Sequence, residues 1–181
     1  RPLIIGGFGV SSVRWGNFAV QNADLILAIG TRLDTHETGD NLSTFARGAK
    51  KVVVDIDEGE LDKYKKRGMN VDIIINSDVK DFFDAINHKL DGISKQDMTE
   101  WTEKIKEWEN KYPICLPEYF EQKEKVNPYV FIETLSEASS EGDIIITDAG
   151  ATLTWTMQAY KVKKNQRLFS AFNHSPMGYS L

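Results

Sequence analysis

The stretch ADLILAIG, residues 23–30, decides the fold class of this chain. It is a continuous apolar run that ends in glycine, which is typical of a strand buried on both faces of a parallel sheet. Two further runs repeat the pattern, KKVVVDID at 50–57 and VDIIINSD at 71–78. Segments of helical character accompany them, namely GNFAVQN, DEGELDKYKKRG and VKDFFDAINHKL. Strands that alternate with helices predict βαβ units in a doubly wound parallel α/β layer.

After the third run the chain loses its strand-like pattern. A polar helix is predicted over residues 95–111, where Trp101, Ile105 and Trp108 recur at helical spacing and would form a docking face. A connector bounded by prolines follows this helix. Residues 91–126 are therefore interpreted as a helical linker.

A second α/β unit is predicted after the linker. Asn127 and Pro128 open a helix, GDIIITDAG (142–150) predicts a strand, and QRLFSAF (166–172) predicts another. Helices are expected from ATLTWTMQAYKV, between those strands, and from MGYSL, at the end of the sequence. The predicted fold class is thus α/β, with two partial three-layer domains of doubly wound parallel sheet joined by the linker.

Composition and charge exclude several classes of protein. The chain has 181 residues, 41% of them hydrophobic, which is enough for a globular core. Its formal net charge of −5 argues against a nucleic-acid or anionic-membrane partner. We expect a cytoplasmic protein, because the sequence has no apolar run of roughly 20 residues and no signal peptide. Cys115 is the only cysteine and the histidines are widely separated, so no metal-ligand set is predicted.

The corners that follow the strands are the places to look for chemistry, since ligands of open α/β sheets bind beyond the carboxyl ends of the strands. Arg32 lies in the glycine-containing corner after the first strand, and Asp57 lies after the second. A glycine turn into a helix can receive a phosphate, and an acidic strand end can bind a ribose, so this pair hints at a nucleotide. The alternative for Asp57, together with Asp55, is to cap the following helix.

The order of these corners resembles a known family. The segments NFAVQNADLILAIGTRLD, GAKKVVVDIDEGEL and VDIIINSD are similar to the middle domain of thiamine-diphosphate-dependent enzymes of the acetolactate synthase and pyruvate decarboxylase superfamily. After the linker, GDIIITDAGATLTWTMQAYKVKKNQRLFSAFNHSPMGYSL resembles the start of that family's diphosphate-binding domain. The resemblance implies a middle domain at residues 1–90, without its N-terminal part, and a truncated diphosphate-binding domain at 127–181.

The resemblance also implies an activity for a longer parent protein. The parent is expected to be a lyase or transferase that acts on a small-molecule 2-keto acid with thiamine diphosphate and Mg²⁺, as a homodimer or homotetramer. The chain begins with Arg1 and ends before the family's magnesium-binding Gly-Asp-Gly motif, so we expect a fragment that is inactive alone. The alternatives are a non-catalytic module that binds FAD or ADP, and a degenerate paralogue with a structural role.

Two motifs carry the implied cofactor contacts. TDAG places Asp148 and Gly150 at the diphosphate end, and Thr152 stands where acetolactate synthases usually have histidine. In the Met-Gly motif, the Met177 side chain would form a wedge between the two cofactor rings. Its backbone N–H, next to Gly178, would face the pyrimidine.

The loop AFNHSP precedes the Met-Gly motif and replaces a stretch that is usually rich in glycine. The Ser175 carbonyl is the implied acceptor for the cofactor's amino group. His174 has two open interpretations: a substrate-facing proton donor, since imidazole titrates near neutrality, or a packed loop residue. In the first unit, Arg32, Asp57 and the GFG segment match flavin-contacting corners, so the middle domain would hold FAD, ADP or no nucleotide.

Overall fold

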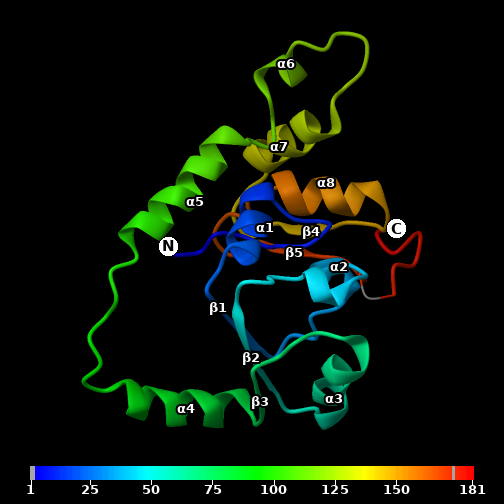
Figure 1. The fold of residues 1–181 in the computed structure, drawn as a ribbon. Coiled ribbons are helices and arrows are strands. Elements are labelled where there is room, and N and C mark those ends of the chain that lie inside the picture. The colour runs from blue at the N-terminus through cyan, green and yellow to red at the C-terminus, as the bar shows by residue number, and fades with distance from the viewer. Residues whose placement is uncertain (1–2, 173) are drawn as a thin grey trace. The chain divides into compact units, whose positions relative to one another are not determined.

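The computed structural model describes residues 3–172 and 174–181, without the side chain of Lys65; Arg1, Pro2 and Asn173 lie outside the described residues. The chain divides into two compact units. Figure 1 labels their helices and strands. The first comprises Arg1–Gly9 and Arg14–Trp108, and the second comprises Val10–Val13 and Glu109–Leu181. The division falls inside the segment interpreted as a linker, and the assignment of enzyme domains to residue ranges stays a prediction.

The first unit is built on a three-stranded parallel sheet. Its strands are β1 (Leu25–Ile29), β2 (Lys50–Asp55) and β3 (Ile73–Asn76), in the order β1-β2-β3. Leu27 pairs with Val52, which pairs in turn with Ile73, so these side chains share one face of the sheet. The predicted parallel α/β class is confirmed, and each strand is shorter than its apolar run because the flanking residues turn into loops.

Helices follow or precede each strand of this sheet. They are α1 (Arg14–Gln21), α2 (Thr35–Thr38), a short 3-10 helix η1 (Leu42–Thr44), α3 (Glu58–Arg67), α4 (Val79–Leu90) and α5 (Thr99–Lys111). An aspartate begins each helix that comes directly after a strand: Asp34 caps α2, Asp57 caps α3 and Asp78 caps α4. In each case the carboxylate accepts backbone N–H bonds of the first turn, which stabilises the helix start. The interpretation of Asp57 as a helix cap is therefore confirmed.

The core of the first unit lies on one face of this sheet. Ala28 and Val53 contribute the strand side, and Leu61 and Tyr64 cover them from α3, which lies beside β2 and β3 in Figure 1. Lys51 is buried in the middle strand, where its Nζ donates to the carbonyl oxygens of residues 46 and 49 at 2.8 and 3.2 Å. A buried ammonium is tolerated because these two acceptors replace water.

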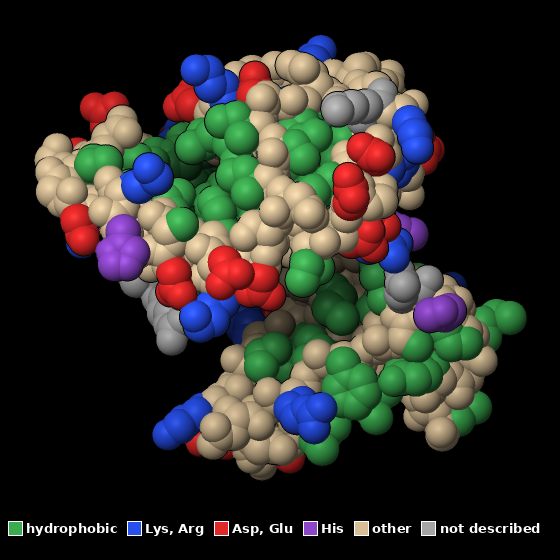
Figure 2. All heavy atoms as spheres, turned by 90° about the horizontal axis from the view of Figure 1, so that it is seen from below, with side chains coloured by type: hydrophobic (Ala, Val, Ile, Leu, Met, Phe, Trp, Pro, Cys, Tyr) green, Lys and Arg blue, Asp and Glu red, His purple; other side chains and the backbone are tan. Residues whose placement is uncertain are grey.

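The opposite face of the sheet reaches the surface. Leu25, Leu27 and Ile73 are 60%, 43% and 53% exposed. Figure 2, which looks at the molecule from the side of α3 and α4, shows hydrophobic side chains in groups among charged ones. Part of the first unit's apolar surface is thus left uncovered by the described residues.

Helix α5 packs by its aromatic residues. The rings of Trp101 and Trp108 meet edge to face with centroids 5.8 Å apart, and Phe18 of α1 meets Trp108 at 5.6 Å. Ile105, between the two tryptophans on the helix surface, is buried. The predicted docking face is confirmed, and it attaches this helix to α1.

The second unit contains a two-stranded parallel sheet with its own helices. Its elements are α6 (Pro117–Phe120), α7 (Pro128–Ala138), β4 (Ile144–Ile146), α8 (Ala151–Ala159) and β5 (Arg167–Phe169). Ile132, Ala159 and Tyr160 form its buried centre, with Trp155 packed against it. Gln158 accepts a hydrogen bond from the Tyr129 hydroxyl at 2.8 Å and donates to the carbonyl of residue 12 at 3.1 Å. Trp155 and Gln158 are therefore packing residues of the second unit.

The predicted helix at MGYSL is wrong. Residues 177–180 form a turn. Gly178 has φ 87°, in the left-handed region, which a right-handed helix does not allow. Its N–H is bonded to a side chain of another corner, so tertiary structure decides the conformation of this segment.

Candidate functional site

The first corner begins where β1 ends. The N–H of Gly30 bonds to the Val54 carbonyl at 2.9 Å, and Leu33 takes a left-handed conformation with φ 44°. Between them, the carbonyls of Thr31 and Arg32 accept hydrogen bonds from the buried Tyr64 hydroxyl at 3.4 and 3.1 Å. Burial raises the pKa of Tyr64 to about 12, with smaller contributions from nearby carboxylates. The Tyr64 hydroxyl of α3 thus fixes the backbone of this corner, while the Arg32 side chain is exposed to solvent.

The GFG segment lies directly against this corner. A Cβ atom added at Gly9 would overlap the carbonyl oxygen of His36 in α2, and Gly9 has φ 101°. Asn17 bonds both the N–H and the carbonyl of Gly9, at 2.6 and 3.1 Å. Only glycine allows the backbone at residue 9 to come this close to α2. The structure therefore places the Gly7–Gly9 segment beside the corner that contains Arg32. The Asp57 carboxylate instead accepts the N–H groups of residues 59 and 60.

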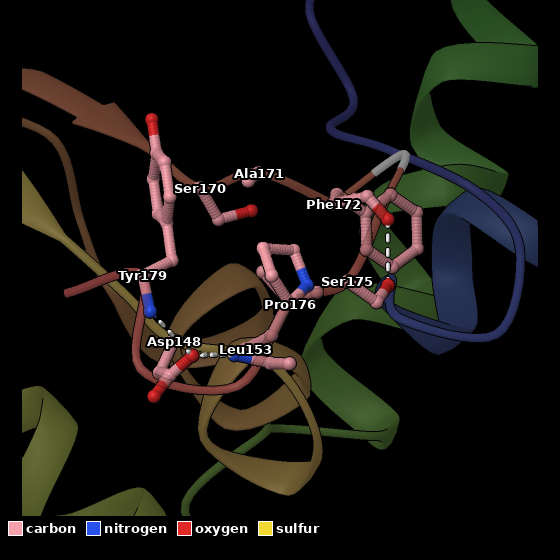
Figure 3. Close-up of a pocket in the computed structure, with 9 residues that line it drawn as sticks. Asp148, Leu153, Ser170, Ala171, Phe172, Ser175, Pro176 and Tyr179 are labelled. Atoms are coloured by element: carbon pink, nitrogen blue, oxygen red, sulfur yellow. Dashed lines mark hydrogen bonds between the residues drawn. The ribbon is translucent and has the colours of Figure 1, made fainter.

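The second corner is organised by Asp148, just beyond β4. Its carboxylate accepts the N–H of Ala149 at 2.7 Å, of Gly178 at 2.8 Å and of Tyr179 at 3.3 Å. The Ala149 bond first, and then those from Gly178 and Tyr179, hold the pKa of Asp148 below its ordinary value. Figure 3 shows the carboxylate between the start of α8 and the Met-Gly turn. Two motifs 30 residues apart are joined here.

A small depression lies beside this carboxylate. It is shallow and open to solvent, and it is lined by Asp148, Ala149, Leu153, Ser170, Ala171, Phe172, Ser175, Pro176 and Tyr179. The depression thus joins the end of β4, the start of α8 and the loop before the Met-Gly turn.

The turn itself presents an apolar side chain. Ser175 has φ 45°, its N–H bonds to the Ala171 carbonyl at 2.8 Å, and its hydroxyl bonds to the Phe172 carbonyl at 2.7 Å (Figure 3). Met177 follows and is 94% exposed. His174 is exposed as well, and its backbone N–H also bonds to Ala171.

The start of α8 offers hydrogen-bond donors. Gly150 takes the cap position with φ 79° and provides no side-chain cap, and Thr152 in the first turn is exposed. Uncapped N–H groups at a helix start favour an anion. The donors of α8 and the Thr152 hydroxyl fit a diphosphate and Met177 fits an apolar ring, whereas the Asp148 carboxylate does not suit an anionic group.

Sequence reasoning missed two residues of these corners. Tyr64 lies in a segment read only as a helix, and nothing in the chain's pattern pairs it with residues 31 and 32. Tyr179 directly follows the Met-Gly motif, and this adjacency was the available signal. Among the described residues, no group of three His, Cys, Asp or Glu side chains could hold a metal ion. No helix in the described ranges is long and apolar enough to cross a membrane.

The chain is similar to known proteins over its whole length. Residues 1–86 match the family described as thiamine pyrophosphate enzyme, central domain. The whole chain aligns with the acetolactate synthase large subunit of Cyanidium caldarium at 28% identity, over 30% of that protein. Residues 1–86 belong to the central domain of the thiamine-diphosphate-dependent enzyme family.

Other members of this family give the same result. Acetolactate synthase 1, chloroplastic, of Zea mays is 31% identical over 99% of the chain and 27% of its own length. Acetolactate synthase isozyme 1 large subunit of Escherichia coli K12 is 28% identical over 100% of the chain and 30% of its length. The chain thus spans less than a third of the length of these acetolactate synthases. The alignments include both the Asp148 corner and the Met177 turn.

Proposed function

We propose that this chain forms part of a thiamine-diphosphate enzyme that acts on a 2-keto acid by decarboxylation and carboligation, as an acetolactate synthase-like lyase or transferase. The observation that carries the proposal is the contact between Asp148 and the Met177–Gly178 turn. Thiamine diphosphate would contact both motifs at once, the first with its diphosphate end and the second with its rings, so the two motifs must lie next to each other. Sequence similarity to acetolactate synthases over the whole chain supports it.

The chain's residues would hold and orient the cofactor. Thiamine diphosphate, when bound, supplies the electron sink for loss of CO₂ from a 2-keto acid. The N–H groups at the start of α8, next to Gly150, and the hydroxyl of Thr152 bind the diphosphate. The backbone of Ser175 and Met177 orients the pyrimidine, and the Met177 side chain supports the rings. Mg²⁺ is proposed as the metal ion of the diphosphate, although no group of three His, Cys, Asp or Glu side chains among the described residues could hold it.

His174 stays a candidate for the substrate side of the site. Its side chain is exposed on the loop before the turn, where it could donate a proton to a bound keto acid. The test is His174→Gln in the intact enzyme, which should lower kcat for the keto acid and leave thiamine diphosphate affinity unchanged. An unchanged kcat would leave this residue as part of the loop structure.

A second candidate function concerns the first unit. The close approach of Gly9 to α2 and the exposed Arg32 support a nucleotide site for FAD or ADP. Equilibrium dialysis of the protein against FAD and ADP, with Arg32→Ala as the variant, tests this site. Binding of either nucleotide without any thiamine-dependent activity in the intact protein would favour a non-catalytic nucleotide-binding module.

The experiment that tests the proposed function uses the intact enzyme. Pyruvate consumption is measured with and without thiamine diphosphate and Mg²⁺, and the products are identified. Cofactor-dependent loss of pyruvate with formation of acetolactate supports the proposal. No loss of pyruvate or other 2-keto acids, with the cofactor present, would refute it. The 181-residue chain alone is expected to show no turnover.

Met177→Ala is the sharpest test of the turn. In the intact enzyme it should lower kcat much more than the affinity for thiamine diphosphate, because the side chain shapes the cofactor rather than anchoring it. Met98→Ala is the matched control, since Met98 is also exposed but precedes α5 in the first unit. A parallel fall of kcat and cofactor affinity would mean that Met177 only packs.

The same proposal extends to assembly and location. We propose a homodimer or homotetramer in the cytoplasm, with the 2-keto acid as its small-molecule partner. Analytical ultracentrifugation of the intact enzyme tests the assembly, and a monomer that retains full activity would refute it. Cell fractionation tests the location.

A further inference from the structure

The contact between Asp148 and the Met-Gly turn has a definite geometry. The Oδ1 atom lies 2.7 Å from the Ala149 nitrogen and 3.1 Å from the Gly178 nitrogen, and Oδ2 lies 2.8 Å from the same Gly178 nitrogen. The Tyr179 nitrogen adds a contact at 3.3 Å. Two consecutive backbone N–H groups of the turn therefore converge on one carboxylate, which is a strong, charge-assisted arrangement.

The other end of the same segment is also fixed. The Ala171 carbonyl accepts the N–H groups of both His174 and Ser175, at 3.1 and 2.8 Å. Ser175 is held at φ 45°, a conformation that persists only where the surrounding contacts enforce it. The Ser175 hydroxyl adds a bond to the carbonyl of Phe172.

Between these two anchors the chain has little freedom. Pro176 fixes its own φ, and Met177 comes next, immediately before the bonded Gly178. Yet the Met177 side chain is 94% exposed, although methionine is a residue type that is usually buried. The hydrogen bonds of this segment thus fix its backbone, whereas the flexible apolar side chain of Met177 is left exposed to solvent.

We propose that Asp148 is a positioning residue: its carboxylate holds the Met177–Gly178 turn at the end of β4, so that the Met177 side chain stands free for a cofactor ring. This assignment rests on the proposed function. It differs from a role as a diphosphate ligand, because a carboxylate repels a phosphate and its oxygens are already used by backbone N–H groups. The low pKa of Asp148 agrees with a carboxylate that is ionised at neutral pH.

The first test observes the contact itself, in the 181-residue chain, by ¹⁵N NMR and amide hydrogen exchange. Asp148→Asn should move the Gly178 and Tyr179 amide resonances and speed their exchange by about tenfold or more. Asp143→Asn is the matched control, since that carboxylate at the other end of β4 accepts the Ser140 N–H at 2.7 Å. It should leave the two turn amides unchanged. Turn amides that do not respond to Asp148→Asn would overturn the proposal.

The second test measures the consequence in the intact enzyme. Asp148→Asn should lower kcat by about tenfold or more, because a displaced positioning group misaligns the reacting atoms, while the dissociation constant of thiamine diphosphate changes less than about threefold. Asp143→Asn should keep the wild-type kcat. A wild-type kcat in Asp148→Asn, or an equal loss of cofactor affinity, would overturn the positioning role. A wild-type enzyme without thiamine-dependent turnover would instead overturn the proposed function, and the amide measurement would still decide whether Asp148 anchors the turn.

Discussion

Tyr64→Phe removes one oxygen atom from the core of the first unit and releases the corner of Arg32. The ring of Tyr64 is fully buried in the cluster around Val53, so phenylalanine keeps the packing. What disappears are the hydroxyl's bonds to the carbonyls of Arg32 at 3.1 Å and Thr31 at 3.4 Å. The longer bond is near the limit for a hydrogen bond and adds little.

The expected loss follows from these two contacts. A hydrogen bond of this type contributes about 0.5–1.5 kcal/mol, so we expect Tyr64→Phe to lower the free energy of unfolding by about 1 kcal/mol at pH 7. For a unit of this size the midpoint of thermal unfolding should fall by about 4 °C. Tryptophan fluorescence is a suitable probe, because Trp15, Trp101 and Trp108 lie in the first unit.

The same hydroxyl gives a second, independent readout. The pKa of Tyr64 is raised to about 12, first by burial and then by Glu60 and other carboxylates. A raised pKa means that the folded state favours the neutral form, so this stability is complete below pH 10 and is lost as pH rises from 10 towards 12. The stability difference between wild type and Tyr64→Phe should therefore narrow above pH 10.

The control is Tyr119→Phe, which removes a hydroxyl from a half-buried tyrosine of α6 in the second unit. It should change the midpoint by less than about 2 °C, as substitutions outside a bonded core do. Equal midpoints for Tyr64→Phe and Tyr119→Phe would refute the reasoning. So would a stability difference for Tyr64→Phe that stays constant from pH 7 to pH 11.

Three further outcomes are expected. Gly9→Ala should lower the free energy of unfolding, measured in urea, by about 1–3 kcal/mol, because the new Cβ overlaps the backbone of α2 at a positive φ. Gly48→Ala is the control: it has open space around it and should change the free energy of unfolding by less than about 0.5 kcal/mol. Equal losses in the two variants would contradict this. The pKa of Cys115 is raised to about 12 by burial and by Glu133, so its alkylation at pH 8 should be slow and should become faster in Glu133→Gln, and a fast wild-type reaction would contradict it. The Asp148 carboxyl, followed by ¹³C NMR, should titrate below its ordinary pKa of 3.8, and its stabilising contact should be lost as pH falls through that lowered pKa; a midpoint at or above 3.8 would contradict it.

The strands and helix starts could be predicted because their causes are local. A continuous apolar run such as residues 25–29 predicts a strand of a parallel sheet, and it forms one, although Leu25 and Leu27 are exposed on one face and not buried as expected. Asp78 precedes an amphipathic stretch, and α4 runs from Val79 to Leu90 as predicted. In both cases the residues that decide the structure are neighbours in the sequence.

The features that escaped prediction depend on contacts between distant residues. Lys51 interrupts an apolar strand, and only the fold shows that two carbonyl oxygens receive its ammonium group. The turn around Gly178 was expected to be helical because its partner, Asp148, lies 30 residues earlier. The resemblance pointed to both motifs, but the hydrogen bond that joins them follows from the structure alone.

The short segment Val10–Val13 gives the chain an unusual connectivity. It belongs to the second unit, where Gln158 bonds the carbonyl of Ser12, although the residues on both sides of it belong to the first. The backbone therefore passes between the units three times, at residues 9–10, 13–14 and 108–109. A protease that cuts once, after Trp108, would not separate the two units, because the N-terminal fragment would carry Val10–Val13 of the second unit and the C-terminal fragment would lack them. Expression of the second unit from Glu109 onwards would likewise lack four of its residues, so gene dissection of this protein needs a circularly permuted or two-segment design.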